Sequence, residues 1–191
     1  MNTIYPRQIN VSSVKISEGR SLRQSTFNRP TLVVAHDLVG KMLVRWIGRQ
    51  RHSVIITETE AYIGEEDLAC HARFGRTKRN AALYGNAGSW YVYLVYGMHW
   101  MLNVVTEKVD KPAAVLIRSG VSIVSGELLR GPGILTKALE IDGRVYGQSA
   151  TVGDLQIHDI GKFPGRILRT PRVGIDYAGK YKDKRWRFLL A

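Results

Sequence analysis

Residues 52–63, HSVIITETEAYI, are the stretch that decides the fold. The run is rich in β-branched residues, which is typical of a β-strand. Side chains of a strand alternate between its two faces, so Glu58, Glu60 and Tyr62 are expected to share one face. Residues 41–47, KMLVRWI, also predict a strand, and the polar residues GRQR between the two runs predict a turn.

The middle of the chain predicts more strands. Residues 89–107, SWYVYLVYGMHWMLNVVTE, are dominated by aromatic and β-branched residues, and they predict a hairpin that bends near Tyr96 and Gly97. Residues 113–120, AAVLIRSG, predict another buried strand. Shorter strand-like segments lie at 154–160, DLQIHDI, and at 172–179, RVGIDYAG.

Helical signals are fewer. Residues 29–40 have Pro30 at a favourable first-turn position and Gly40 as a stop. Residues 131–141 begin with Gly-Pro-Gly and predict a second helix. The charged, turn-rich region after the long strand predicts a short helix near residues 65–74, EEDLACHARF.

These elements predict one α+β domain built around a mostly antiparallel sheet with flanking helices. No internal repeat, low-complexity tract or linker divides the 191 residues. Residues 1–24 are polar and mixed, and we expect weak structure there. The 31 residues from Gly161 hold nine basic and two acidic side chains among apolar ones, so we expect a folded basic face.

The charge of the chain points to a polyanionic partner. Lys and Arg number 28 against 16 Asp and Glu, which gives a formal net charge of +12. Nucleic acid is the commonest partner of such a basic domain. A solvated basic surface and attraction to anionic lipid are the alternative interpretations.

Composition also bears on the compartment. No apolar run approaches the roughly 18 residues of a membrane span, and the amino terminus has no secretory h-region. A single cysteine allows no internal disulfide, which favours a reducing compartment. We therefore expect a cytoplasmic, nucleoid-associated protein in a prokaryote or a nuclear one in a eukaryote, with no membrane association.

Acids crowd the end of the long strand and the residues that follow it. Four glutamates and an aspartate lie between Glu58 and Asp67, directly before a basic segment. Spacing alone favours a solvated strand end with surface acids. A catalytic carboxylate needs a group that orients it and a water within reach, and His71 and Arg118 are candidates for those contacts of Glu60.

A metal site is not expected at Cys70 and His71. Zinc sites use three or four ligands at recognisable spacing, and the chain has one cysteine and no HxH, HxxxH or CxxC motif. Adjacent residues rarely point at one another as a nucleophilic Cys–His pair requires. Cys70 is therefore interpreted as a small buried residue.

The aromatic run YVYLVYG has two interpretations. Tyr91 and Tyr93 share a face of the predicted strand, and core packing is the first interpretation for Tyr91 and its neighbour Trp90. Tyr96 falls at the hairpin bend, where less surrounds it. In a basic protein, an aromatic side chain at such a tip could wedge into a base stack.

Taken together, these segments resemble a known family. ETEAYIGEEDLACHARFGRTKRN, YVYLVYGMHWMLNVV, AAVLIR, GPGILTKAL and RVGIDYAG match, in that order, motifs of the alkyladenine (3-methyladenine) DNA glycosylase family. The resemblance covers roughly residues 25–190. It implies a catalytic domain over residues 25–191 with a curved antiparallel sheet, and a monomer without a cofactor. The implied partner is double-stranded DNA that contains damaged purines.

The resemblance also implies the reaction and the catalytic residues. The family's activity is monofunctional hydrolysis of the N-glycosidic bond of alkylated or deaminated purines, of the DNA-3-methyladenine glycosylase II type, in base excision repair. Glu60 resembles the general base that activates water. Arg118 resembles its orienting partner, which shares the water with His71.

Further residues match the family's base pocket and wedge. Tyr62, His71 and Tyr93 resemble the walls that stack on a flipped base, and His71 also resembles a backbone contact at the pocket entrance. Asn103 resembles the gate against the exocyclic amine of guanine. Tyr96 resembles the wedge that fills the gap in the duplex.

Basic residues near the motifs are expected to hold the DNA backbone: Arg76, Lys78, Arg79 and Arg172. The chain departs from the family pattern at residues 119–130, which form a shorter segment, and at Ile134, where a basic residue is common. No lysine in the motifs suits a Schiff base, so we expect no strand cleavage. The rival hypotheses are a non-catalytic nucleic-acid-binding module and a hydrolase of free nucleosides.

Overall fold

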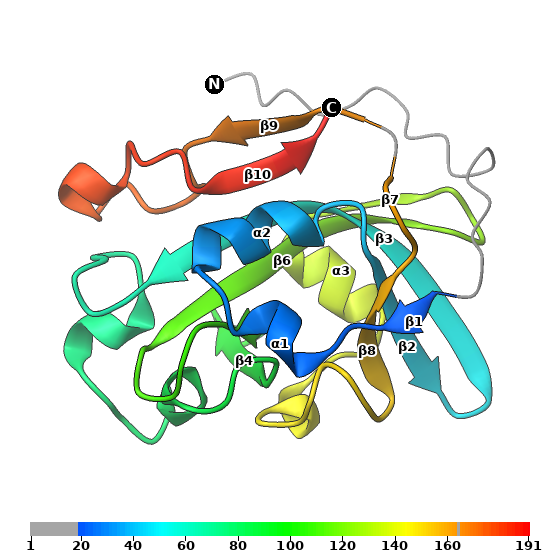
Figure 1. Ribbon diagram of the computed structural model, residues 1–191, viewed down its shortest axis with the longest axis horizontal. Helices are drawn as coiled ribbons and strands as arrows, with labels where there is room; N and C mark the ends of the chain where they lie inside the picture. Colours follow the sequence, from blue (N-terminus) through cyan, green and yellow to red (C-terminus); the bar gives the residue numbers. More distant parts are fainter. Residues whose placement is uncertain (1–18, 164) are drawn as a thin grey trace.

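The computed structural model describes residues 19–163 and 165–191, which form one antiparallel sheet with short helices (Figure 1). The sheet has ten strands in the order β1-β8-β2-β3-β6-β5-β4, with β10 on β3, β9 on β10 and β7 on β6. The strands are β1 (Arg20–Ser21), β2 (Met42–Ile47), β3 (Gln50–Ile63), β4 (Trp90–Val95), β5 (His99–Val105), β6 (Ala113–Ser122), β7 (Leu128–Arg130), β8 (Leu155–Asp159), β9 (Ile167–Thr170) and β10 (Arg187–Leu190).

Strand β3 is the longest element, with 14 residues, and it organises the sheet. Strand β6 pairs with it from Val54 to Ile63. On its other edge, β2 pairs with the first half of β3, and β10 pairs with the second half from Glu58 to Glu60. The acidic end of β3 is therefore an interior part of the sheet, and both glutamates are buried.

The helices are short and contribute to the main core. They are α1 (Gln24–Phe27), α2 (Thr31–Leu38) and α3 (Pro132–Ala138). Val34 and Leu38 of α2 and Leu135 of α3 belong to one large apolar cluster with Ile117 of β6. Thr59 of β3 donates a hydrogen bond to the carbonyl of Ala35 at 2.7 Å, so this residue faces α2.

A smaller cluster contains residues of the connection between β3 and β4. This connection contains the 3-10 helices η1 (His71–Phe74) and η2 (Ala81–Tyr84); η3 (Gly143–Val145) and η4 (Gly179–Tyr181) lie later in the chain. Cys70 and Leu83 pack there with Tyr91 of β4, and Tyr62 and Tyr93 pack against them. Thr59 faces α2 while Tyr62 belongs to this second cluster, so the predicted alternation along β3 is confirmed.

Most expected elements are present. The α+β class, the mostly antiparallel sheet, the hairpin of β4 and β5, and the helices at Thr31–Leu38 and Pro132–Ala138 are confirmed. Most of the segment 1–24, for which weak structure was expected, lies outside the described residues. Its described end forms β1, which pairs with β8, and the first residue of α1.

The short helix expected near residues 65–74 is present only as η1, and one expected strand is wrong. Residues 65–74 form turns and the 3-10 helix η1, because the Asp67 carboxylate accepts hydrogen bonds from the backbone N–H groups of Ile63 and Ala69 and bends the chain there. Residues 172–179 form bends and turns and no strand. The backbone N–H of Val173 bonds to the Glu60 side chain and takes no part in a ladder.

Gly120 allows β6 to approach β3 closely next to the acidic segment. A Cβ atom at this position would lie 2.2 Å from a side-chain carbon of Val54 and 2.7 Å from the backbone oxygen of Ile55. Gly120→Ala should therefore lower the free energy of unfolding by about 1–3 kcal/mol, as overpacking does. Denaturant unfolding measures this change. Val124→Ala, at a residue that is 87% exposed, is the control and should change it by less than about 0.5 kcal/mol. An equal stability of Gly120→Ala and the parent would contradict the close approach.

Candidate active site

An irregularity in the pairing of β3 with β6 builds the site. The register shifts on both sides of Glu58, which leaves Thr57 on β3 and Arg118 on β6 without a paired residue. A β-bulge of this kind re-aims side chains. As a result, Arg118 and the next residue, Ser119, both reach the Glu58 carboxylate, each through a hydrogen bond of 2.9 Å.

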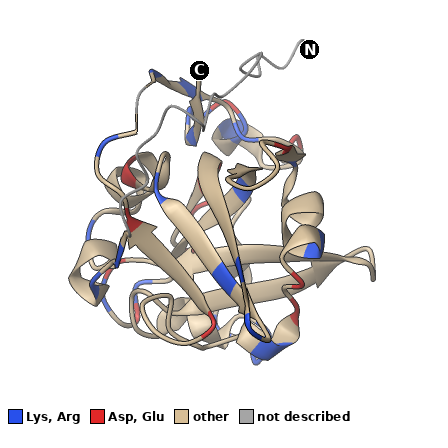
Figure 2. Ribbon diagram, turned by 90° about the vertical axis from the view of Figure 1, so that its right-hand side faces the viewer, with Lys and Arg blue, Asp and Glu red and all other residues tan. Residues whose placement is uncertain are grey.

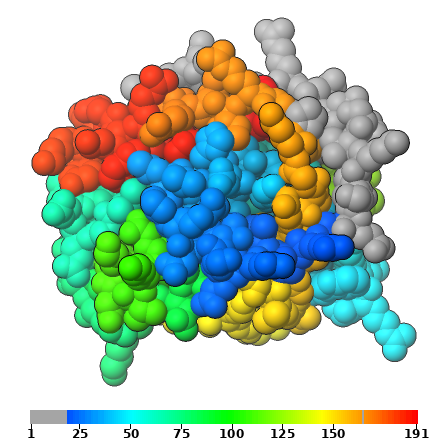
Figure 3. All heavy atoms as spheres, in the orientation of Figure 1, coloured from blue at the N-terminus to red at the C-terminus, as the bar shows by residue number. Residues whose placement is uncertain are grey.

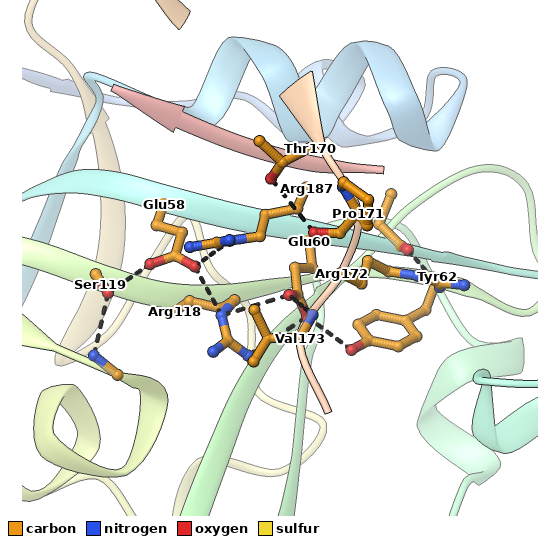
Figure 4. Close-up of polar contacts among 12 residues, drawn as sticks. Glu58, Glu60, Tyr62, Arg118, Ser119, Thr170, Pro171, Arg172, Val173 and Arg187 are labelled. Atoms are coloured by element: carbon orange, nitrogen blue, oxygen red, sulfur yellow. Dashed lines mark hydrogen bonds and ion pairs between the residues drawn. The ribbon is translucent and has the colours of Figure 1, made fainter. Parts of the chain in front are cut away.

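Glu58 is the centre of a buried ionic cluster (Figure 4). Its Oε1 accepts from the Nε atoms of Arg118, at 2.9 Å, and of Arg187, at 2.6 Å. Its Oε2 accepts from the Ser119 hydroxyl. A buried carboxylate is stable only when its charge and lone pairs are satisfied, and this cluster satisfies them.

Glu60 lies two residues further along the same face and is fully buried. Its Oε1 accepts from the backbone N–H of Val173 at 2.8 Å, and its Oε2 accepts from the Tyr62 hydroxyl at 2.8 Å. Arg118 approaches both oxygens at 3.5 Å. Arg118 therefore lies between the two glutamates, and its closer partner is Glu58 (Figure 4).

The donors around Glu60 keep their protons. Burial alone would lower the pKa of Arg118, but Glu60 and Glu58 outweigh it and raise the pKa above the usual value. Burial, followed by the charge of Glu60, raises the pKa of Tyr62 well above its usual range. Arg118 is therefore a cation, and Tyr62 is a neutral phenol that donates a hydrogen bond to Glu60.

An aromatic slot adjoins Tyr62. Its wall residues come from the β3–β4 connection and from β3, β4 and β5, and include Tyr62, Cys70, His71, Tyr91, Tyr93 and Asn103. The cavity they leave is about 20 Å³. That is room for about one water, so the slot is closed to a purine. A purine can enter only if a wall residue moves.

His71 is held at the slot by two tyrosines. Its Nδ1 and the Tyr91 hydroxyl share a hydrogen bond of 2.7 Å, and its ring centroid lies 4.3 Å from that of Tyr93. Burial, together with the positive charges of Arg79 and Arg73, lowers the pKa of His71 to about 4. His71 is neutral near pH 7, and the bond to Tyr91 leaves Nε2 as the nitrogen for a ligand.

Asn103 lies in the slot wall on β5 and is buried. Its side-chain nitrogen donates to the backbone carbonyls of Tyr91, at 3.1 Å, and Met101, at 3.2 Å. Both N–H groups of the amide are therefore used within the sheet. The group that Asn103 offers to the slot is the amide oxygen, an acceptor.

Tyr96 is separate from the slot. It lies in the turn between β4 and β5, is 89% exposed and has a φ of 51°. Positive φ is unfavourable for a residue with a bulky side chain. The hairpin therefore presents a large aromatic ring to solvent from a strained position, and such strain often marks a functional residue.

Three of the four residues expected at the DNA backbone are exposed. Arg76, Lys78 and Arg79 are exposed in the segment between η1 and η2. Basic positions occur on helices, strands and turns of the face drawn in Figure 2. The expectation for the fourth residue, Arg172, is wrong. Its side chain is fully buried and paired with Asp67, so it cannot reach a phosphate.

Arg172 instead fixes the segment that holds Glu60. Its guanidinium donates to both oxygens of Asp67, at 2.6 and 2.8 Å, and to the backbone carbonyl of Ala61 at 2.8 Å. It also lies over the Tyr62 ring, 4.7 Å from the centroid. The next residue, Val173, donates its backbone N–H to Glu60. Asp67 and Arg172 therefore anchor both Tyr62 and the Val173 amide.

The structure brings together most of the residues expected in the catalytic site. Glu60, Tyr62 and Arg118 contact one another, and His71, Tyr93 and Asn103 line the adjoining slot. The expectation did not include Glu58 as the closer partner of Arg118, or the tyrosine that holds His71. The Val173 amide was also missed, because a backbone donor has no residue-type signal. The only available signal for Glu58 was that it shares a strand face with Glu60.

No group of three His, Cys, Asp or Glu side chains within residues 19–163 and 165–191 could hold a metal ion. In the same ranges, no helix has the length and apolar character needed to cross a membrane.

The chain is similar to known proteins along most of its length. Residues 25–191 match the family model described as Methylpurine-DNA glycosylase (MPG). A relative from Methanocella arvoryzae is 44% identical, over 87% of this chain and 90% of its own. One from Psychrobacter cryohalolentis is also 44% identical, over 88% and 91%. One from Legionella pneumophila is 40% identical, over 90% and 94%, and all three bear the name "Putative 3-methyladenine DNA glycosylase".

A basic domain with a buried, arginine-held carboxylate beside an aromatic slot, together with these matches, defines a DNA glycosylase. More particularly, the chain belongs to the methylpurine-DNA glycosylase family.

The Asp67–Arg172 pair is buried on both sides, so removal of either partner leaves an unpaired charge. Asp67→Ala and Arg172→Ala should each lower the free energy of unfolding by about 3–5 kcal/mol. The double variant should lose less than the sum, because the two side chains interact. Lys182→Ala, at an exposed residue, is the control and should change stability by less than about 0.5 kcal/mol. Additive losses would contradict direct coupling.

The lowered pKa of His71 predicts a pH effect. The folded-state pKa of about 4 lies below the ordinary 6.5, so the unfolded chain binds this proton first. The contribution of His71 to stability is complete above pH 6.5 and is lost as the pH falls through this window to about 4. An NMR titration of the ring should give a midpoint near 4. A midpoint near the ordinary value would show that the ring is solvated.

Proposed function

We propose that the protein removes alkylated purines, with 3-methyladenine as the first candidate, from double-stranded DNA by hydrolysis of the N-glycosidic bond. The observation that carries this proposal is Glu60, a buried carboxylate next to an aromatic slot, with a cationic guanidinium beside it. The names of the relatives, which specify 3-methyladenine, support the choice of substrate.

Glu60 is the general base of the proposed reaction. Arg118 makes the longest contacts to Glu60, at 3.5 Å, so we place the attacking water between these two groups. The water oxygen bonds to C1′ of the deoxyribose while its proton passes to Glu60. The electron pair of the broken C1′–N bond stays on the purine. Positive charge develops on the sugar in the transition state, and a nearby carboxylate stabilises it.

The slot suits a cationic purine. A purine alkylated at N3 or N7 carries positive charge and leaves as a neutral base, so its bond is weak. The rings of Tyr62 and Tyr93 line the slot, and electron-rich ring faces attract a cation. Glu60 adds a negative charge at Tyr62. A neutral purine such as hypoxanthine or 1,N6-ethenoadenine lacks these gains and would react more slowly.

The base must leave the duplex to reach Glu60. Flipping costs a few kcal/mol and costs least at damaged or mispaired sites. Tyr96, exposed at the hairpin turn, is the proposed wedge that replaces the lost base in the stack. Arg76, Lys78 and Arg79 are the proposed phosphate contacts, which position the duplex without reading its sequence.

The proposed enzyme is monofunctional and uses no cofactor. Strand cleavage of the lyase type needs an amine that attacks C1′ and forms a Schiff base. No lysine lines the slot among the described residues. Relative to the family pattern, the hairpin of β6 and β7 is short, and the exposed Ile134 on α3 stands where a basic residue is common, so we expect fewer cationic contacts with DNA. They affect affinity for DNA and leave the chemistry at Glu60 unchanged.

A base-release assay tests the proposal. Duplexes that contain 3-methyladenine, hypoxanthine or 1,N6-ethenoadenine, and bulk alkylated DNA, are incubated with the protein, and free base is measured. The proposal requires release from alkylated DNA and an intact strand at the abasic product. Binding to DNA without release of any base would support a non-catalytic binding module. Release from free nucleosides but not from DNA would support a nucleoside hydrolase.

Glu60→Gln tests the role of the general base, because an amide of nearly the same shape cannot take a proton. Base release should fall by about 10²–10⁴-fold, the usual contribution of general-base catalysis, while binding of damaged duplex is retained. Single-turnover release and a binding titration measure the two effects. Glu66→Gln, at an exposed acid six residues away, is the matched control and should keep full activity. Activity of Glu60→Gln equal to that of the parent would remove Glu60 from the mechanism.

A further inference from the structure

A second hollow adjoins the slot, and we call it the outer groove. It is open to solvent, has a volume of about 420 Å³ and shares His71 and Tyr91 with the slot. Its outer wall includes Arg73, Phe74, Arg79 and Tyr177. The two cavities are therefore neighbours that share wall residues, and their sizes differ about 20-fold.

The rim of the outer groove is formed by two exposed aromatic rings and an arginine. Phe74 is 72% exposed and Tyr177 is 62% exposed. The Arg73 guanidinium lies 4.4 Å from the ring centroid of Phe74 and 5.0 Å from that of Tyr177. Side chains this exposed bury little apolar surface and contribute little to the stability of the fold. The arginine holds them as a preformed stacking surface.

The two sides of the rim come from distant parts of the chain. Phe74 ends η1, which follows β3, and Tyr177 lies in the turn before η4. The two segments pack together through Ala69, Ile175 and Ala178. In Figures 1 and 3, the segment near η4 lies beside the connection that follows β3. The rim is thus fixed by tertiary packing.

The outer groove is also cationic. Neither Arg73 nor Arg79 forms an ion pair with a carboxylate of the described residues. After burial, these two arginines are the next causes of the lowered pKa of His71, which shows that their field reaches the shared wall. Within the described part of the chain, both donate only to backbone carbonyls, those of Leu68 and Leu94, so their charges are not neutralised. Stacking surfaces combined with such cations are typical of sites for unpaired nucleotides.

The closed slot makes the outer groove relevant to the reaction. The slot, at about 20 Å³, cannot receive a purine before its wall moves. The outer groove, at about 420 Å³, is large enough to hold one. Tyr177 lines the outer groove together with His71 and Tyr91, which also line the slot.

We propose that the outer groove is a stacking subsite that receives the extruded purine of the damaged strand before the slot opens. This proposal rests on the proposed function and adds a step to it. The arginines of the groove do not favour a cationic base, so the groove does not select alkylated purines over neutral ones. Selection of the cationic purine then belongs to the slot, next to Glu60.

The test compares Phe74→Ala, Tyr177→Ala and their double variant with the conservative Phe74→Tyr and Tyr177→Phe. Single-turnover base release from damaged duplex is measured at increasing enzyme concentration. For each alanine variant, the half-saturating enzyme concentration should rise at least about fivefold, the effect of losing one stacked base. The maximal rate should stay within about twofold of the parent, because the chemistry occurs in the slot.

Two controls define the interpretation. Affinity for undamaged duplex should be unchanged in the alanine variants, and the conservative variants should behave like the parent. Val152→Ala, at a residue 64% exposed and outside the groove, should have no effect. An equal loss of affinity for damaged and undamaged duplex would overturn the proposal, since the groove would then hold intact DNA. A fall in maximal rate at constant half-saturation would also overturn it.

A fluorescence measurement separates this proposal from the proposed function. 2-Aminopurine, placed opposite an abasic site in a duplex, should lose fluorescence when it stacks in the groove of the parent, and this quenching should be absent in the double variant. If the parent quenches the 2-aminopurine fluorescence but releases no base, the stacking subsite is supported and the proposed function is contradicted. If the parent releases base and the double variant matches it in quenching and half-saturation, the groove proposal fails.

Discussion

The contact of Arg118 with two buried glutamates depends on the irregular pairing of β3 with β6. A regular ladder would leave one residue of β6 opposite each residue of β3. The paired bulges instead let Arg118 and Ser119 both reach Glu58, and Arg118 extends to Glu60. Two carboxylates this close would repel each other and lose their solvation. Arg118, Arg187 and the backbone N–H of Val173 offset that cost. The sheet therefore stabilises a charged acid where an apolar core residue would ordinarily lie.

This arrangement leaves a site that is assembled but closed. The Tyr62 hydroxyl occupies one oxygen of Glu60, and the slot beyond it has room for about one water and none for a purine. Opening must be driven by a ligand that binds the open form more tightly than the closed form. A cationic purine gains from the ring faces and from the charge of Glu60, whereas an ordinary base gains only from stacking. A closed slot thus contributes to selectivity without any direct reading of the duplex sequence.

Much of this could be predicted from the sequence, since it depends on local alternation. The period of two along β3 predicted that Glu58, Glu60 and Tyr62 share a face, and the aromatic run predicted the hairpin with Tyr96 at its turn. Contacts between distant segments could not be predicted from these patterns. Arg172 was expected on the DNA-binding surface, because a basic tail gives no signal that one of its arginines pairs with Asp67, 105 residues away. Residues 172–179 have strand-like composition. The backbone N–H of Val173 donates to the Glu60 carboxylate, however, so it cannot bond to a neighbouring strand.

The central claim is that Glu60 holds the attacking water against a purine lodged in the slot. A crystal structure of the Glu60→Gln variant with a duplex containing a damaged purine tests it most directly. The account predicts an extruded purine between Tyr62 and the rings of His71 and Tyr93, and a water between residue 60 and Arg118 in line with C1′ of the deoxyribose. A purine that remains stacked in the duplex, or that is bound with its C1′ remote from residue 60, would contradict it.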